Sequence, residues 1–385
     1  MKVTIIQGAF FPVPPLLGGA VEKMWFRLGK EFARLGHEVV HVSRQHASLP
    51  GEEVIDGVRH RRVPGYDQPR SLLKLKLLDL LYSFRACRQV SPDSDVVVTN
   101  TFASPLLLSS TLKSRAYVDI QRMPRGQCRW YGQAGRLRAN STPVAGAIQA
   151  EIPTSSWGKV SLIPNPIPFD PPEQIDLDAK QKRILYCGRV HPEKGLEILM
   201  RTAHRLSPEW SVHVVGPWEV TQGGGGKGYL EHLKTLAAGS AVQFHGPEFD
   251  SDQLALHYQQ AAIFVYPSIA EQGETFGLAP LEAMAWGCVP VVSDLACFRD
   301  FIHPEHNGRI FNHRSARPEE ELEQILQELC AQPDLRHALA MQASQVRDSH
   351  HPRTIARLFL EDFEAMTRGE SSPFAPVPAE IAKSP

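Results

Sequence analysis

The chain of 385 residues has little that would assign it to the metalloproteins, the membrane-spanning proteins or the nucleic-acid binders. Its 6 cysteines are scattered, without a CxxC pair or a histidine at metal-ligand spacing, which fits a reducing cytosol and predicts no metal site. The formal net charge of -1 gives no sign of a nucleic-acid partner. No apolar run approaches the ~20 residues that a spanning helix needs. Because a strand pattern begins at Lys2, we also expect no signal peptide and a cytoplasmic protein.

The common phosphate-binding fingerprints are missing too. No GxGxxG follows the first predicted strand, and the run Gly223–Lys227 is not a P-loop, because neither Ser nor Thr follows its lysine. Instead, a strand–helix alternation occurs twice, on either side of the proline-rich segment 160–174. We predict an α/β protein with two doubly wound parallel-sheet domains.

The predicted boundaries follow from this alternation and from the composition of the C-terminus. The N-terminal domain is placed at 1–168 and the C-terminal domain at 169–351. A last helix is expected over 352–367, and a disordered tail over 368–385, which is rich in proline and serine.

The N-terminal domain offers two candidate positions at the carboxyl ends of its strands. Gly18 and Gly19 end the loop that follows the first strand, where glycine suits a tight turn and a close backbone approach. Gln121 ends the strand that begins at Arg115; its amide can hydrogen-bond a hydroxyl but cannot carry a proton. Between them, 70–90 predicts a leucine-rich helix with several Lys and Arg residues, which we interpret as a crossover helix partly buried between neighbours. Contact of this helix with anionic lipid is the alternative.

The stretch 267–294 is the most informative part of the C-terminal domain. An apolar strand leads into a polar loop with Glu274, a helix follows from Gly277, and Gly287 ends it before the next strand. The N–H groups of the helix start, together with the helix dipole, suit a phosphate. The carboxylates of Glu274 and Glu282 can accept hydrogen bonds from hydroxyls of a ribose or a sugar. The amides in question belong to Thr275, Phe276, Gly277 and Leu278.

A cationic pair stands at an equivalent place earlier in the same domain. Arg189 follows the first strand of the domain, and Lys194 opens the next helix. Two fixed cations in a cleft between the domains would stabilise the negative charge of a leaving diphosphate, in the place of Mg²⁺.

These motifs resemble those of the retaining glycosyltransferases of family 4, the glycosyl transferases group 1. The resemblance rests on the Glu-x7-Glu stretch from Glu274 to Val292, on Gly188-Arg189-x4-Lys194-Gly195, and on Asn165 in the linker. It implies the GT-B fold, with two Rossmann-like domains and an interdomain cleft. It also implies transfer of a hexose from a nucleoside-diphosphate sugar to an acceptor hydroxyl with retention of configuration and without a cofactor or metal.

The resemblance also assigns roles to the candidate residues. Arg189 and Lys194 would hold the diphosphate, Glu282 the ribose and Glu274 the sugar hydroxyls, so that Arg189, Lys194 and Glu274 are the catalytic candidates. The donor contacts would be completed by Gly18, Gly19, Gln121, Thr275, Phe276, Gly277 and Leu278. Gln121 stands where many relatives carry a histidine that contacts the transferred sugar.

Several alternatives stay open at this point. The donor nucleotide is UDP or GDP, with UDP preferred, and the acceptor is a glycan, a lipid-linked sugar or a small molecule of envelope or polysaccharide biosynthesis. Because of Gln121, the chain could instead be a catalytically silent nucleotide-sugar-binding or envelope-assembly protein. A nucleotide-sugar epimerase shares the two-domain plan. A glycoside hydrolase would explain the paired carboxylates, but not the cationic pair. The oligomeric state is left open.

Overall fold

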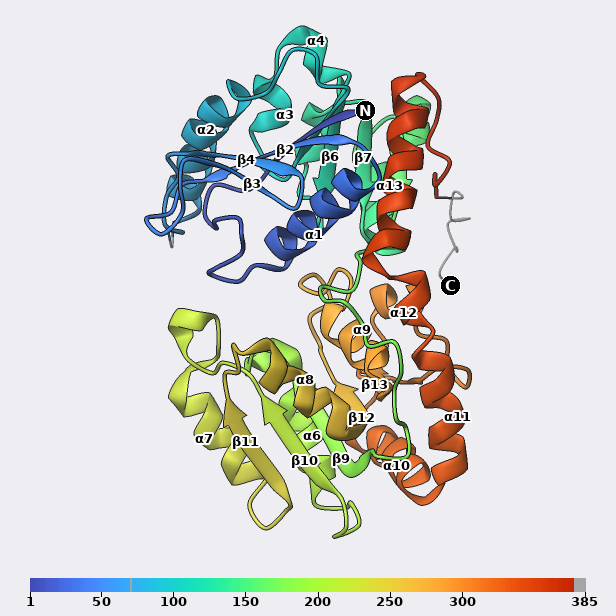
Figure 1. The fold of residues 1–385 in the computed structure, drawn as a ribbon. Helices are drawn as coiled ribbons and strands as arrows, with labels where there is room; N and C mark the ends of the chain where they lie inside the picture. Colours follow the sequence, from blue (N-terminus) through green and yellow to red (C-terminus); the bar gives the residue numbers. More distant parts are fainter. Residues whose placement is uncertain (70, 377–385) are drawn as a thin grey trace. The chain divides into compact units, whose positions relative to one another are not determined.

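The computed structural model describes residues 1–69 and 71–376, and it divides the chain into two compact units. Unit 1 comprises Met1–Phe169 together with the C-terminal segment from His350, and unit 2 comprises Asp170–Ser349. The division falls inside the proline-rich segment 160–174. Each unit is an α/β domain built on a largely parallel sheet (Figure 1), which confirms the predicted fold class.

Unit 1 contains an 8-stranded sheet in the order β3-β4-β2-β1-β5-β6-β7-β8. All neighbouring pairs are parallel except the hairpin of β3 and β4. Its strands are β1 (Lys2–Ile6), β2 (Glu38–Arg44), β3 (Glu52–Ile55), β4 (Val58–Val63), β5 (Val96–Thr99), β6 (Ala116–Ile120), β7 (Arg136–Ala139) and β8 (Val160–Leu162). Its helices are α1 (Ala20–Arg34), α2 (Leu72–Cys87), α3 (Ser104–Leu107), α4 (Ser110–Lys113), α5 (Thr142–Glu151) and α13 (Pro352–Thr367), with the short 3-10 helices η1 (Gln127–Trp130) and η2 (Thr154–Lys159).

Two hydrophobic clusters cover the two faces of this sheet, as a doubly wound fold requires. On one face α1 and α13 lie side by side (Figure 1), and the Trp25 and Phe359 rings meet at 5.1 Å between centroids. On the other face, Tyr82 of α2 and Ile148 of α5 are fully buried within the second cluster. The central strands β1 and β5 are therefore buried on both sides, which is why they form nearly continuous apolar runs in the sequence.

The C-terminal segment is tied to this sheet by a buried carboxylate. Asp362 on α13 accepts hydrogen bonds from the Tyr117 and Ser372 hydroxyls, both at 2.8 Å, and lies 2.9 Å from Nε of Arg136. Beyond α13, the Leu162 amide donates to the carbonyl of Phe374. The prediction of disorder from Arg368 onward is thus wrong for 368–376, because this segment forms hydrogen bonds with α13 through Ser372 and with β8 through Phe374. The rest of the predicted tail, 377–385, lies outside the described residues.

Unit 2 contains a 6-stranded, fully parallel sheet in the order β11-β10-β9-β12-β13-β14. Numbered from β9, this is the order 3-2-1-4-5-6 of a dinucleotide-binding domain, and the chain reverses direction across the sheet between β9 and β12. The strands are β9 (Gln181–Cys187), β10 (Ser211–Val215), β11 (Val242–Gly246), β12 (Ala261–Tyr266), β13 (Val289–Ser293) and β14 (Arg309–Phe311). The helices are α6 (Leu196–Ala203), α7 (Gly226–Leu236), α8 (Ser251–Gln260), α9 (Leu278–Ala285), α10 (Pro318–Ala331), α11 (Pro333–Ala343) and α12 (Val346–Ser349), with η3 (Pro192–Lys194), η4 (Val220–Gln222) and η5 (Ala296–Asp300).

The buried carboxylate of Asp362 gives a first testable prediction. Replacing Asp362 by Asn leaves the Arg136 guanidinium buried without its counter-charge, and loss of one partner of such a pair costs about 3–5 kcal/mol. We expect native-state hydrogen exchange to show a reduction of this size in the protection of α13 and β6 amides. The matched control is Glu364→Gln on the same helix, because Glu364 is exposed and 3.9 Å from Arg368. A change below about 1 kcal/mol for Asp362→Asn, the range of surface ion pairs, would contradict the role assigned to this carboxylate.

Candidate functional site in unit 2

The candidate site lies where β9 and β12 end next to each other. In open parallel sheets, ligands bind outside the carboxyl ends of the strands at such a reversal point. The turn after β9 passes through η3 and reaches Gly195, which has a φ of 64°. A Cβ at Gly195 would lie 2.1 Å from the carbonyl oxygen of Pro267, so glycine is required where the two loops touch.

An ion pair joins these two loops. Nζ of Lys194 lies 2.7 Å from Oε2 of Glu274, and the two side chains are only 8% and 12% exposed. The same carboxylate oxygen accepts a hydrogen bond from the Ser268 hydroxyl at 3.3 Å. Nζ of Lys194 also lies 5.4 Å from the centroid of the Tyr266 ring. The structure therefore brings together two of the predicted catalytic residues and adds Ser268 and Tyr266, which the sequence analysis missed.

Arg189 is held by a different set of partners. Its guanidinium donates to the carbonyl of Gly223 at 2.9 Å and to Oε1 of Glu193 at 2.6 Å, and its side chain is 44% exposed. The glycine-rich loop that fails as a P-loop thus supports Arg189 through its backbone. Both cations of the predicted pair are matched with a carboxylate, so an incoming anion would share or replace these contacts.

Glu282 belongs to a third contact near the end of β9. Its Oε2 accepts a hydrogen bond at 3.0 Å from the hydroxyl of Tyr258, which α8 supplies. Burial raises the pKa of the Tyr258 hydroxyl well above its usual value, and the nearby Cys187 thiol and Glu282 carboxylate raise it further. Tyr258 therefore stays protonated and donates to Glu282. Sequence analysis could not find Tyr258, because a helical tyrosine at this position looks like any core residue.

A glycine with positive φ caps the start of α9. Gly277 is its N-terminal cap with a φ of 94°, and a Cβ there would lie 2.5 Å from the Phe298 ring. Phe276 is buried with a relative exposure of 3%, which fixes the loop in front of the helix. Of the four predicted amides, that of Leu278 lies in the first turn of the helix, where backbone N–H groups have no intrahelical acceptor, and those of Thr275–Gly277 precede it.

The glycine pair of unit 1 lies in the loop that leads into α1. Gly18 and Gly19 have φ values of 80° and 94°, and Gly19 caps the helix. A Cβ on Gly19 would lie 2.1 Å from Oε2 of Glu22. Burial raises the pKa of the Glu22 carboxyl, which the sequence analysis did not single out. The close carboxylate, in addition to the positive φ, explains the glycine.

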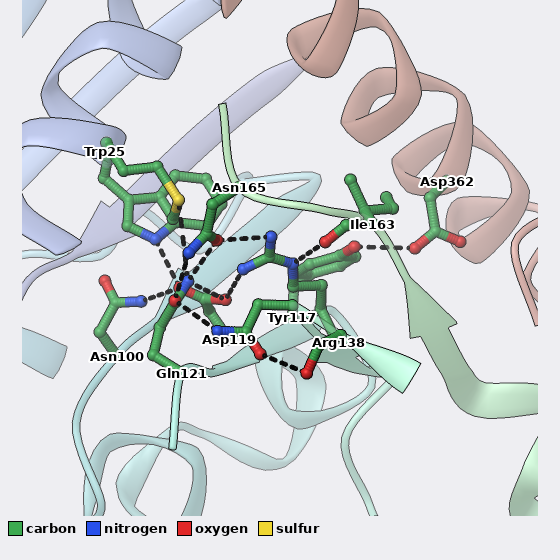
Figure 2. A network of polar contacts seen from close by, with 12 residues as sticks. Trp25, Asn100, Tyr117, Asp119, Gln121, Arg138, Ile163, Asn165 and Asp362 are labelled. Atoms are coloured by element: carbon green, nitrogen blue, oxygen red, sulfur yellow. Dashed lines mark hydrogen bonds and ion pairs between the residues drawn. The ribbon is translucent and has the colours of Figure 1, made fainter. Parts of the chain in front are cut away.

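Gln121 is part of a polar network at the carboxyl ends of β6 and β7 (Figure 2). Its Nε2 donates to the Asp119 carboxylate at 2.9 and 3.0 Å and to Oδ1 of Asn165 at 3.2 Å. Its Oε1 accepts from the side-chain amides of Asn140 and Asn165 at 3.2 and 3.1 Å. Both ends of the amide therefore have partners within unit 1. A contact with a sugar hydroxyl, as predicted for Gln121, would require the exchange of one of these bonds.

Asp119 is the centre of this network. Its carboxylate forms a fully buried ion pair with Arg138 at 2.7 Å, and it accepts hydrogen bonds from Nε1 of Trp25 and Nδ2 of Asn100, both at 2.7 Å. Arg138 in turn donates to Oδ1 of Asn165 at 2.8 Å (Figure 2). The network thus connects α1, three strand ends and the beginning of the proline-rich segment. The geometry makes Gln121 a positioning residue for Asn165 and Asp119.

Comparison with known proteins identifies the family of unit 2. The sequence model of the glycosyl transferases group 1 matches residues 170–346. An uncharacterized glycosyltransferase of Methanocaldococcus jannaschii is 33% identical over 135 residues, which cover 35% of this chain and 33% of the relative. A phosphatidyl-myo-inositol mannosyltransferase of Mycobacterium tuberculosis is 24% identical over 343 residues, covering 80% of this chain and 82% of the relative. The chain aligns with less than half of the length of the first curated relatives that it matches, with 33% and 43% covered.

Solved structures extend the likeness to both units. Sucrose-phosphate synthase from Thermosynechococcus elongatus has a TM-score of 0.75 at 18% identity. The likeness covers 96% of this chain and 100% of that chain. The HepE protein of Anabaena, solved in complex with UDP-glucose, has a TM-score of 0.66 at 15% identity, with 95% of this chain and 100% of that chain covered. These likenesses show the fold, which is GT-B.

Two features are absent from the part of the chain that the structure describes. No helix there combines the length and the apolar character that a membrane crossing needs. No group of 3 or more His, Cys, Asp or Glu side chains is arranged there to hold a metal ion.

The network around Gln121 leads to a second prediction. The substitution Gln121→Glu keeps the size of the side chain but replaces the donor to Asp119 by a carboxylate, so two like charges would meet in a partly buried site. Loss of this donor, which leaves a buried acceptor without its partner, costs on the order of 1–3 kcal/mol. We expect chemical denaturation at pH 7 to show this loss, and to show a smaller loss at acidic pH, where the new carboxyl binds a proton.

The matched control is Gln133→Glu, because Gln133 is exposed on the same unit. It should change the free energy of unfolding by less than about 0.5 kcal/mol. If the two substitutions lowered the free energy of unfolding equally, Gln121 would not be a positioning residue for Asp119 and Asn165.

Proposed function

Residues 170–346 form a domain of the glycosyl transferases group 1, and on this premise we propose that the chain is a retaining hexosyltransferase of family 4. It moves a hexose from a nucleoside-diphosphate sugar to a hydroxyl of a glycan, a lipid-linked sugar or a small molecule. We place the reaction in the cytoplasm, in envelope or polysaccharide biosynthesis. The observation that carries the proposal is the pair of Lys194 and Glu274, 2.7 Å apart, at the reversal point of the sheet.

The proposed donor site uses the contacts of unit 2. The departing diphosphate gains negative charge as its bond to the anomeric carbon breaks, and Lys194 and Arg189 stabilise that charge electrostatically. The amides at the start of α9, from Thr275 to Leu278, support the phosphate and the sugar. Glu282, already oriented by Tyr258, accepts hydrogen bonds from the ribose hydroxyls. Glu274, held by Lys194 and Ser268, accepts hydrogen bonds from hydroxyls of the sugar.

The proposed reaction balances without a further reagent. The bond between the anomeric carbon and the phosphate oxygen breaks, and the acceptor oxygen bonds to the same face of that carbon. The proton of the acceptor hydroxyl passes to the departing phosphate oxygen. In this scheme the chain needs neither a histidine at position 121 nor a metal ion, since Arg189 and Lys194 supply the positive charge.

UDP is the proposed donor nucleotide. The support is the structural likeness to the Anabaena HepE protein, whose structure contains UDP-glucose. GDP is the alternative, and the two are separated by thermal shift with UDP, GDP, UDP-glucose and GDP-mannose as probes. A ligand at about 100 times its dissociation constant stabilises the protein by about 2.7 kcal/mol.

A second candidate is a catalytically silent nucleotide-sugar-binding protein. The observation that favours it is Gln121, whose amide is occupied by Asp119, Asn140 and Asn165. Such a protein would be stabilised by UDP-sugars but would release no UDP from them in the presence of a cell-envelope extract as acceptor. An epimerase would instead leave a changed sugar on the nucleotide.

The third prediction concerns the ion pair itself. We expect Lys194→Met and Glu274→Gln each to slow UDP release from the stabilising UDP-hexose by roughly 100-fold, because each removes one preorganised contact to the transition state. The reaction should continue in EDTA. The control Lys182→Met removes an exposed lysine of the same sheet, 56% accessible and paired with Glu209, and should leave the rate unchanged.

Folding must be separated from catalysis in this experiment, because each single substitution leaves a nearly buried charge without its partner. The double variant removes both charges and should recover stability without recovering activity. Single variants that retain activity within threefold of the parent, or loss of activity in EDTA, would contradict the proposed site.

A further inference from the structure

Helix α2 exposes most of its leucines and buries Asp79 and Ser83. The exposed fractions are 72% for Leu72, 82% for Leu73, 55% for Leu77 and 50% for Phe84, with Leu80 and Leu81 near two fifths. The interpretation of this helix as partly buried between neighbours therefore holds for Tyr82 and Ala86 but is wrong for these six exposed side chains. Its predicted start at Arg70 lies outside the described residues.

The inward face of α2 explains this inversion. Asp79 is 6% exposed, and its Oδ2 accepts the Ala103 amide at 3.0 Å at the start of α3. The Ser83 hydroxyl donates to that of Thr101 at 3.1 Å, and Tyr82 is fully buried. Burial raises the pKa of the Asp79 carboxyl to about 6. A rotation of α2 that buried the leucines would break these contacts, so the leucines are held toward solvent.

The exposed apolar side chains continue onto the neighbouring segment. α3 packs against α2, and Nζ of Lys76 lies 5.6 Å from the centroid of the Phe102 ring. Leu73, Leu77, Leu80 and Phe84 recur at intervals of three and four residues along one side of the helix. We call the whole set the α2–α3 patch: Leu72, Leu73, Leu77, Leu80, Leu81 and Phe84 of α2, with Phe102, Leu106 and Leu107, which are 36–39% exposed. Apolar patches of this kind mark interaction surfaces.

The charged side chains that α2 and its C-terminal end expose have one sign. Lys74, Lys76 and Arg88 are exposed along α2 and its end, and Arg85 is half-buried. The helix carries a single acidic residue, Asp79, which faces inward. The chain as a whole has a formal net charge of -1, so this positive charge is a local property of the surface.

We propose that the α2–α3 patch docks the chain on the surface of an anionic lipid bilayer. Leucine and phenylalanine side chains enter the boundary between headgroups and acyl chains, while Lys and Arg side chains reach the lipid phosphates. A second copy of the chain fits less well, because a two-fold contact through this patch would place cations against cations. Docking does not depend on the proposed reaction, although it would bring the chain to a lipid-linked acceptor.

Vesicle sedimentation tests the proposal with the full chain. We expect binding to vesicles of equal parts phosphatidylglycerol and phosphatidylcholine, and at least tenfold weaker binding to vesicles of phosphatidylcholine alone. The triple variant Leu73→Ser, Leu77→Ser, Phe84→Ser should bind the anionic vesicles at least tenfold more weakly. The double variant Lys74→Gln, Lys76→Gln should lose about fivefold per charge, and raised salt should weaken the parent.

Matched controls distinguish binding through this patch from nonspecific binding of other exposed apolar side chains to the vesicles. The triple variant Val220→Ser, Phe249→Ser, Met341→Ser removes apolar side chains of unit 2 that are 70%, 77% and 52% exposed, and should bind as the parent does. Stabilisation by UDP should be unchanged in the α2 triple variant, so a failure of docking is distinguishable from a failure of the donor site.

Three results would overturn the proposal. The first is no binding of the parent to anionic vesicles. The second is equal binding of the α2 triple variant and the parent. The third is a concentration-dependent dimer of the parent that the α2 triple variant abolishes, which would assign the patch to a second copy of the chain.

Discussion

The nearly buried ion pair of Lys194 and Glu274 is the contact on which the candidate site depends. Two charges that are 8% and 12% exposed are tolerated only because each compensates the other. The pair joins the turn after β9 to the loop after β12, and Gly195 permits the close approach of these loops. A diphosphate placed at the start of α9 would give Lys194 a second anionic partner.

The sequence predicted those features of this site that depend on local order along the chain. Arg189, Lys194 and Glu274 lie in the loops and turns that come after apolar runs, so their place beyond the strand ends followed from the strand pattern. The partners that hold them did not follow. Gly223 reaches Arg189 across 34 positions, and Tyr258 reaches Glu282 from another helix. The orientation of α2 could not be predicted for a related reason: leucines occur almost all round this helix, so apolar spacing could not indicate its inner face.

The side-chain amide of Gln121 joins polar residues of unit 1 that come from different segments. It complements Asp119 on one side and Asn140 and Asn165 on the other. An amide both donates and accepts, so it can join a carboxylate to the two asparagines. The result is a connected network of hydrogen bonds at the ends of β6 and β7, and Asn165 of the proline-rich segment belongs to it.

Buried carboxylates organise unit 1 in the same manner at three places. Asp79, Asp119 and Asp362 are at most 6% exposed, and each gathers donors from segments distant in sequence. Burying a carboxylate is costly unless its hydrogen bonds are made, so each of these residues favours one arrangement of its neighbours over others. Asp362 fixes the position of α13 on the sheet, and Asp119 fixes the hydrogen-bond network that contains Gln121. Asp79 fixes the rotation of α2 about its axis. The apolar face that α2 presents to solvent is therefore a consequence of the polar contacts beneath it.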